Sequence, residues 1–156
     1  MKELKLLIVA LIVLIGAIFS FNKAFGMTFK QAQSIYYQVA HKNLFTVPPF
    51  KYDPTSDIDA YWTGYYVVVT QGLLDSVRNN NEMAVILGHE LGHYQQAHWS
   101  DSKTNELLAD RLGFTFAVKA GYSGCKGMRW ILRNGYENSD HPSGRDRYNR
   151  LCGGKR

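Results

Sequence analysis

Two histidines four residues apart, with a glutamate directly after the first, constrain this chain more than any other feature. His89, Glu90 and His93 form the pattern H-E-x-x-H. On an α-helix, residues four apart lie one turn above each other on the same face, so the pattern favours a helix that presents both imidazoles together. Two such nitrogens can bind one Zn²⁺ ion, and the glutamate between them can take a proton from water. A solvated surface helix that carries two histidines is the alternative interpretation.

The residues around this motif predict a helix with one buried stripe. Asn79 is the expected N-cap, and Glu82 is expected to reach back to it in a capping box. Gly88 and Gly92 are poor helix formers beside the histidines, which indicates that another element approaches closely there; two tolerated glycines are the alternative. We expect the helix to end near Trp99. Apolar residues recur at helical spacing at Met83, Ala84, Leu87, Leu91 and Tyr94.

A catalytic zinc ion takes three protein ligands and keeps one position for water, so a third ligand is needed. Glu106 is the best candidate. It lies on a second predicted helix, which begins between Asp101 and Thr104 and closes at Gly121. Asp110 follows one turn later on the same face, where it can accept a hydrogen bond from the imidazole N–H of a ligand.

His98 is the rival third ligand. Five helical residues after His93, it is rotated about 140° away from the ligand face, so a structural role or a place at the edge of the site fits it better. Ala109 and Gly113 share the face of Glu106 and allow the two helices to pack closely. The sequence therefore predicts a zinc site of His89, His93 and Glu106.

Four segments carry a resemblance to a known family: 67–74, 84–93, 106–113, and the H-P-S sequence at 141–143 followed by Arg147 and Leu151. In this order they resemble the HtpX/CaaX-prenyl-protease family of gluzincin zinc metallopeptidases, a family that also includes soluble periplasmic and mitochondrial proteases. The resemblance implies an α+β fold. It would be a minimal zincin-like domain, with two zinc-site helices packed on a small β-sheet that has an edge strand.

The resemblance also implies an activity, that of a zinc endopeptidase with one Zn²⁺ ion per chain and a polypeptide substrate. Glu90 would take a proton from the attacking water as general base and deliver it to the leaving amine. His141 and Arg147 are both candidates for the donor that stabilises the oxyanion, and the alternatives are a loop histidine and a surface arginine. A zinc-bound but non-catalytic binding or regulatory protein, and an anchored accessory factor with a purely structural zinc ion, are the other functions considered.

The substrate is expected to bind along a strand. The run from Tyr65 to Thr70 is aromatic and β-branched, which is typical of a strand. The resemblance makes it an edge strand, so Val67, Val68 and Val69 are predicted to bind an extended polypeptide through main-chain hydrogen bonds. The pattern alone is also that of an ordinary buried strand.

Two departures from the family bear on this groove. The gap of 13 residues between His93 and Glu106 is shorter than in most relatives, which suggests a minimal domain with an open cleft. The segment 59–64 stands where the family usually has an Asn-Ala stretch.

The first 26 residues are expected to be a leader, followed by one metallopeptidase domain over 27–156. Lys2 and Lys5 precede 16 uncharged residues, which span about 24 Å as a helix against a hydrocarbon core of roughly 30 Å. Small residues precede Met27, as before a cleavage site, so the leader is either a secretory signal peptide or an uncleaved membrane anchor. Either interpretation predicts an extracytoplasmic domain, and an anchor would associate it with the membrane.

Cysteine content and charge add little more. Cys125 and Cys152 are the only cysteines; a disulfide between them would suit an oxidising compartment, and two free thiols are the alternative. The net charge of +5 comes partly from the leader, and no nucleic-acid-binding signature is present. A first helix is predicted over 28–40, with a capping box of Thr28 and Gln31, and a short strand around 50–52. The oligomeric state is not predicted.

Overall fold

The computed structural model describes residues 26–44, 46–96, 102–135, 137–139 and 141–153. Residues 1–25 of the expected leader, His98 and the predicted helix end near Trp99 lie outside the described residues. No helix in the described part is long and apolar enough to cross a membrane. The elements are α2 (Phe29–Asn43), β1 (Phe50–Asp53), β2 (Ala60–Trp62), β3 (Val67–Thr70), α3 (Gln71–Ser76), α4 (Asn80–Gln96), α5 (Lys103–Lys119), α6 (Gly124–Asn134) and α7 (Gly144–Cys152).

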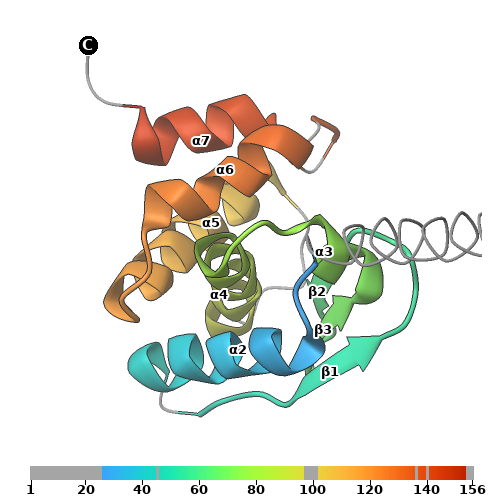
Figure 1. Cartoon of the computed structure of the whole chain (residues 1–156). Coiled ribbons are helices and arrows are strands. Elements are labelled where there is room, and N and C mark those ends of the chain that lie inside the picture. The colour runs from blue at the N-terminus through green and yellow to red at the C-terminus, as the bar shows by residue number, and fades with distance from the viewer. Residues whose placement is uncertain (1–25, 45, 97–101, 136, 140, 154–156) are drawn as a thin grey trace, which may run out of the picture.

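A small mixed sheet stands beside a group of helices (Figure 1). The strand order is β1-β3-β2, with β1 parallel and β2 antiparallel to β3. In the view of Figure 1, α2 lies below α4, α6 and α7 lie above it, and the sheet lies to its right. The helices and the small sheet agree with the predicted α+β class and are compatible with a zincin-like domain.

The prediction that Val67, Val68 and Val69 form an edge strand is wrong. They make up most of β3, which is the central strand and pairs on both sides. All four residues of β3 are buried, as expected for a strand covered on both faces. The main-chain groups of β3 are therefore taken up by β1 and β2, and no substrate strand can pair with it.

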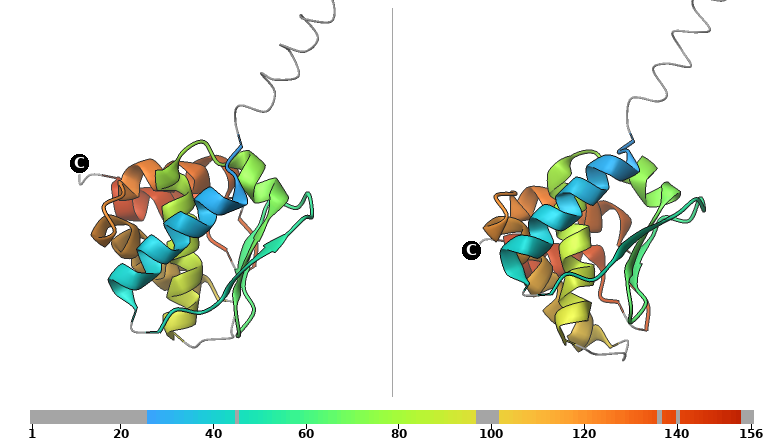
Figure 2. Two further views of the ribbon diagram at one scale, coloured as in Figure 1. Left: turned by 60° about the horizontal axis from the view of Figure 1, so that its bottom comes forward. Right: turned by 90° about the horizontal axis from the view of Figure 1, so that it is seen from below.

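Helix α4 forms the centre of the core rather than an amphipathic surface helix. Every residue from 82 to 92 is buried, because α4 packs against α2, α5, α6 and β2 (Figure 2). A helix that is surrounded in this way is buried nearly all round. The single apolar stripe predicted from the sequence therefore covers less of α4 than the structure buries. The same core cluster includes the fully buried Tyr36, Leu73, Leu74 and Met128.

The helix ends follow the predicted caps with one difference. The capping box of Thr28 and Gln31 is present at α2. Asn79 Oδ1 accepts hydrogen bonds from the backbone N–H of Asn81 at 3.0 Å and of Glu82 at 3.2 Å, as an N-cap does. The Glu82 side chain instead accepts a hydrogen bond from the backbone N–H of Arg78, at 2.9 Å. The predicted box at α4 is thus only half formed.

The Glu82 carboxylate serves a second purpose that the sequence did not indicate. It is almost fully buried and is held by two nitrogens of Arg133, at 2.8 and 3.0 Å. This ion pair fastens α6 to the start of α4. The disulfide between Cys125 and Cys152, left open by the sequence, then joins α7 to α6.

Candidate active site

The two helices that carry the predicted ligands touch through glycine. A Cβ added to Gly113 of α5 would lie 2.5 Å from the backbone nitrogen of His89 on α4, and one added to Gly88 would lie 2.8 Å from the carbonyl oxygen of Gly113. Gly92 meets the backbone of Ala109 in the same way, with 3.1 Å from its added Cβ to the Ala109 Cα. Only backbones without side chains can approach so closely. The expected close packing beside the histidines is confirmed.

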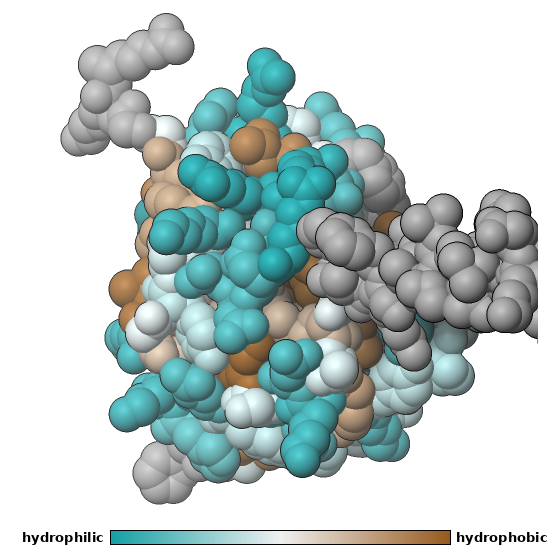
Figure 3. Space-filling model, viewed as in Figure 1, coloured by the Kyte–Doolittle hydropathy of each residue, from teal (hydrophilic) through white to brown (hydrophobic). Residues whose placement is uncertain are grey.

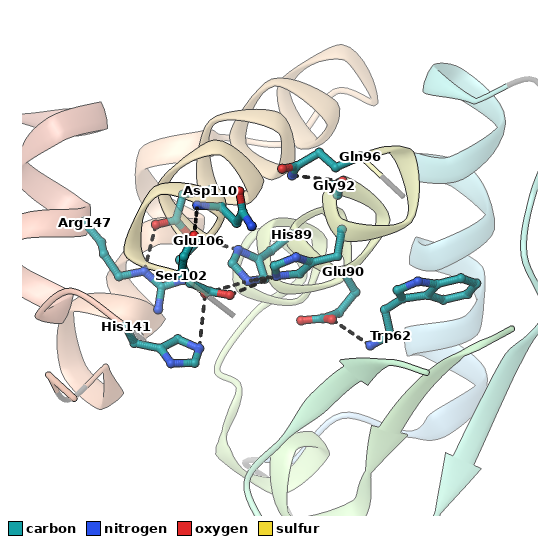
Figure 4. Close-up of polar contacts among 12 residues, drawn as sticks. Trp62, His89, Glu90, Gly92, Gln96, Ser102, Glu106, Asp110, His141 and Arg147 are labelled. Carbon is teal, nitrogen blue, oxygen red and sulfur yellow. Dashed lines mark hydrogen bonds and ion pairs between the residues drawn. The ribbon is translucent and has the colours of Figure 1, made fainter. Parts of the chain in front are cut away.

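This packing brings three side chains to one point. The Nε2 atoms of His89 and His93 lie 3.0 Å apart. Glu106 Oε2 lies 3.3 Å from His89 Nε2, and Glu106 Oε1 lies 3.1 Å from His93 Nε2. One ligand atom from each residue lies within 4.8 Å of the others. Figure 4 shows how α4 and α5 supply the two sides of this cluster.

The arrangement of His89, His93 and Glu106 is better explained by a bound metal cation than by direct contacts among the three side chains. Glu106 Oε2 is buried and accepts no hydrogen bond of good geometry from the described residues, although the Nε2 atoms of His89 and His141 lie 3.3 and 3.2 Å from it. The Nδ1 atom of His89 lies 3.0 Å from Asp110 Oδ1, so a neutral His89 that donates there points the lone pair of Nε2 at the Glu106 carboxylate. Two electron-rich atoms facing each other are repelled unless a cation lies between them. Two imidazoles and a carboxylate are ligands that suit Zn²⁺.

Protons compete with a metal ion for the space between the two imidazoles and the Glu106 carboxylate. Burial alone would lower the pKa of His89, but the hydrogen bonds and negative charges of Asp110 and Glu106 raise it to about 10. Burial raises the pKa of Glu106, whereas the hydrogen bonds from His89 and His93 outweigh it and hold that pKa far below its usual range. Glu106 is therefore ionised, as a metal ligand must be.

Asp110 connects this cluster to α7. One of its oxygens lies against His89, and both accept hydrogen bonds from the Arg147 guanidinium. Asp110 and Arg147 are both buried, with 2 % and 8 % of their surfaces exposed. Although burial raises the pKa of Asp110, the hydrogen bonds from Arg147 and His89 lower it below the usual value. The predicted position of Asp110, next to a ligand imidazole, is what the structure shows.

Glu90 points away from the cluster towards the sheet. Its Oε2 accepts a hydrogen bond of 2.9 Å from the backbone N–H of Trp62, the last residue of β2 (Figure 4). Burial raises the pKa of Glu90 to about 7, and the charges of His89 and His93 act in the opposite direction. A carboxylate with a pKa near neutrality can both accept and return a proton.

His141 also reaches the cluster, from the segment before α7. Its Nε2 lies 3.2 Å from Glu106 Oε2, and its backbone N–H donates to Asn138 Oδ1 at 2.6 Å. The imidazole is 41 % exposed, so it lies at the open side of the site. Arg147, the other predicted oxyanion donor, is turned to Asp110 instead.

A cavity of about 620 Å³ opens beside these groups. It runs between the segment leading into β2, the middle of α4, and the end of α6 with the residues after it. Its lining residues are Asp57, Ile58, Asp59, Ala60, Ile86, His89, Glu90, Trp130, Ile131, Asn134, Gly135, His141 and Arg147. All the predicted catalytic residues, Glu90, His141 and Arg147, lie on this cavity, whereas Val67, Val68 and Val69 do not.

Sequence reasoning missed the role of β2 and of the segment before it. The strand is three residues long, and its sequence Ala-Tyr-Trp shows too little alternation to mark a strand. Thr70 was the one residue that could have indicated a segment beside β3, since a threonine at the end of a buried strand can form a hydrogen bond to a neighbouring segment. Its hydroxyl lies 2.5 Å from the carbonyl oxygen of Asp57 and 2.8 Å from that of Asp59.

One comparison with known proteins supports a class for this protein. Residues 26–102 match the family model of Peptidase family M48, and a comparison with curated proteins finds no match. The matched region runs from α2 through α4, so it contains the H-E-x-x-H motif, and it supports a zincin-like metallopeptidase. Glu106, Asp110, His141 and Arg147 lie beyond it. The contacts of Glu106 with His89 and His93, and that of Asp110 with His89, are therefore observations independent of the family match.

Proposed function

We propose that this protein is a zinc-dependent endopeptidase of the gluzincin type. His89, His93 and Glu106 would hold one Zn²⁺ ion, and Glu90 would be the general base. The observation that carries the proposal is the buried Glu106 carboxylate, whose two oxygens lie 3.3 Å from the Nε2 of His89 and 3.1 Å from that of His93, beside an open cavity. The match to Peptidase family M48 supports a metallopeptidase in general.

A Zn²⁺ ion held by His89, His93 and Glu106 would lower the pKa of water towards 7 and polarise the scissile carbonyl group. The carboxylate of Glu90 accepts the proton of the attacking water and later gives it to the leaving amine. The backbone N–H of Trp62 fixes the orientation of this carboxylate and donates to its ionised form. Asp110, itself held by Arg147, fixes the ring of His89 with Nδ1 away from the cluster.

His141 is the better candidate for the donor that stabilises the oxyanion. Its ring lies at the open side of the cluster, whereas two guanidinium nitrogens of Arg147 are engaged by Asp110. The buried arginine cannot turn to the substrate without leaving the Asp110 charge unpaired. We therefore assign Arg147 to positioning and His141 to contact with the reacting carbonyl oxygen.

In our proposal, the substrate binds at the outer edge of β2, the side away from β3, and not at β3. The Trp62 N–H on this edge already donates to Glu90. Backbone bonds join Thr70 N–H to Asp59, and Thr63 N–H to Tyr66, so the odd-numbered residues of this segment face β3. The main-chain groups of Ala60 and Trp62 then point to the other side, because successive residues of a strand alternate. That side faces the Glu90 carboxylate. An extended polypeptide that pairs with β2 would pass directly over the cluster.

We propose that the domain acts outside the cytoplasm, in the cell envelope or the exterior. The sequence of the leader and the disulfide between Cys125 and Cys152 support this, since disulfides persist in oxidising compartments. Cell fractionation with N-terminal sequencing of the mature protein tests both points. A mature chain that begins at Met27 would establish a signal peptide, and a membrane-bound chain that retains the leader would establish an anchor. Recovery in the cytoplasm would contradict the proposal.

The central test compares the wild type with Glu90→Gln, in zinc content and in cleavage of casein. We expect one zinc ion in each and cleavage by the wild type alone, because the amide cannot accept the proton. Equal cleavage by both would overturn the role of Glu90. One zinc ion in each with no cleavage by either would favour a non-catalytic binding or regulatory protein on this fold.

A further inference from the structure

The cavity beside Glu90 has walls of two kinds. Its inner part is apolar and is formed by Ile86 of α4 and by Trp130 and Ile131 of α6. Ile86 and Ile131 are buried, with 6 % and 3 % of their surfaces exposed. Trp130 is held in place by a hydrogen bond of 2.9 Å from its indole nitrogen to Ser76 of α3. An aliphatic chain that enters from the scissile bond therefore meets a fixed apolar wall.

The rim of the same cavity is acidic. Asp57 and Asp59, both exposed, line it from the segment that leads into β2. The whole chain has the opposite balance, with a formal net charge of +5. Among the described residues that line the cavity, Arg147 carries a full positive charge, and its guanidinium is held by Asp110. The two aspartates thus have no local arginine or lysine partner on the cavity wall.

The acidic rim is held firmly. The Thr70 hydroxyl lies within hydrogen-bond distance of the carbonyl oxygens of both aspartates, at 2.5 Å for Asp57 and 2.8 Å for Asp59. Thr70 is itself 2 % exposed and caps α3 through the backbone N–H of Leu73, at 3.2 Å. Gly72 leaves no room for a Cβ against the carbonyl oxygen of Ser56. The backbone of the segment that carries both aspartates is therefore held by the sheet and α3.

From the apolar wall and the fixed acidic rim, we infer that this cavity is a substrate subsite that selects a lysine or arginine side chain next to the scissile bond. The aliphatic stem lies against Ile86, Trp130 and Ile131, and the cationic end meets Asp57 and Asp59 at the rim. The face of the molecule in Figure 3 is mostly hydrophilic, with hydrophobic residues in small separate patches. The selectivity adds a substrate class to the peptidase activity proposed above, and it rests on that proposal.

A binding experiment tests the subsite without depending on turnover. The full chain with Glu90→Gln is loaded with Zn²⁺ and titrated into labelled alanine-rich peptides that differ at one scanned position: lysine, norleucine or glutamate. Fluorescence anisotropy gives the dissociation constants. We expect the best lysine peptide to bind at least about fivefold more tightly than its norleucine counterpart, and the glutamate peptide to bind most weakly. The preference should shrink as salt is raised from roughly 0.05 to 0.5 M, because the rim is open to solvent.

Substitutions of the rim identify the residues responsible. Asp57→Asn with Asp59→Asn should abolish the preference for lysine over norleucine. Asp75→Asn, on the exposed face of α3, is the matched control and should keep the preference. Circular dichroism and zinc content verify that each variant is folded. Equal binding of lysine and norleucine by the parent protein, undetectable binding of every peptide, or a preference that survives in the double variant would each overturn the inference.

The two proposals can fail separately. Casein cleavage by the wild type decides the peptidase activity, and peptide binding by the Glu90→Gln protein decides the subsite. Cleavage sites mapped by mass spectrometry should then cluster beside lysine and arginine. Cleavage without that bias would leave the peptidase in place and remove the subsite. Lysine-selective binding without any cleavage would support the subsite and contradict the peptidase activity.

Discussion

Arg147 holds both carboxylate oxygens of Asp110, with 2.7 Å from Nε to Oδ2 and 2.6 Å from Nη2 to Oδ1. Asp110 Oδ1 also lies 3.0 Å from the Nδ1 of His89. The last helix of the fold is thereby linked, through one buried carboxylate, to the ring that would bind zinc. Both partners are almost inaccessible to water, so each charge depends on the other.

The Arg147→Met variant should therefore lose stability. It leaves the buried Asp110 charge without its main partner, which costs about 3–5 kcal/mol of the free energy of unfolding. Urea unfolding of the two proteins at equal zinc concentration measures the difference. Arg145→Met, on the exposed side of α7, is the control and should change stability by less than about 0.5 kcal/mol. An equal small effect of both substitutions would show that the Asp110 charge is compensated in another way.

Substitution of Asp110 by asparagine should weaken zinc binding. The amide is a poorer acceptor for the Nδ1–H of His89, and loss of such a partner typically lowers metal affinity about 10–100-fold. Competition with a chromophoric chelator gives the zinc dissociation constant directly. Asp75→Asn serves as the control, since Asp75 bonds to Gln71 on α3, away from the cluster. Unchanged zinc affinity in Asp110→Asn would remove Asp110 from the site.

Gly113→Ala tests the contact between the zinc-site helices. Its methyl group would lie 2.5 Å from the backbone nitrogen of His89, so α5 must move and carry Glu106 with it. We expect a loss of about 1–3 kcal/mol in stability from overpacking, together with weaker zinc binding. Thr115→Ala, two residues further along α5, should retain the zinc affinity of the wild type. Normal affinity in Gly113→Ala would mean that the ligand geometry tolerates helix displacement.

The sequence predicted the meeting of the zinc-site residues as far as it depends on residue type and on spacing within one helix. The spacing of His89 and His93, and that of Glu106 and Asp110, placed each pair on one helical face. Gly88 and Gly113 in the sequence also indicated the close contact between the two helices. The ends of α5 also followed the expected signals, with Ser102 as N-cap and Gly121 at a φ of 93°.

The strand order was not predictable in the same way. Val67 to Val69 reads as a buried run, and the pattern alone allowed the central position that the structure shows. The edge assignment came from the family resemblance and was wrong, because β2 is too short to be recognised as the outer strand. The pairing of strands depends on contacts between segments far apart in the sequence. The three residues of β2 are too few to show a pattern that would reveal such contacts. The burial of Glu82 depends on Arg133, 51 residues later, for the same reason.

His141 should be needed for turnover and not for zinc. Its ring lies at the open side of the cluster, 3.2 Å from Glu106. His141→Ala should lower kcat about 10²–10³-fold, as the loss of one oxyanion donor does. Zinc content should stay at one ion per chain, which separates this role from that of a ligand. Loss of zinc, or kcat at the wild-type level, would contradict the assignment.

Reduction of the disulfide should loosen α7 and, through Arg147, the zinc site. Cys125 and Cys152 lie 27 residues apart in sequence and join α6 to α7; a crosslink over a loop of this size contributes about 3–4 kcal/mol in the chain-entropy model. The variant with both cysteines changed to serine should unfold at lower urea concentration and bind zinc more weakly. Reductant should shift the wild type towards the behaviour of this variant and leave the variant itself unchanged. If the serine variant matched the oxidised wild type in both properties, contacts of α7 with α5 and α6 would suffice to hold Arg147 on Asp110 without the crosslink.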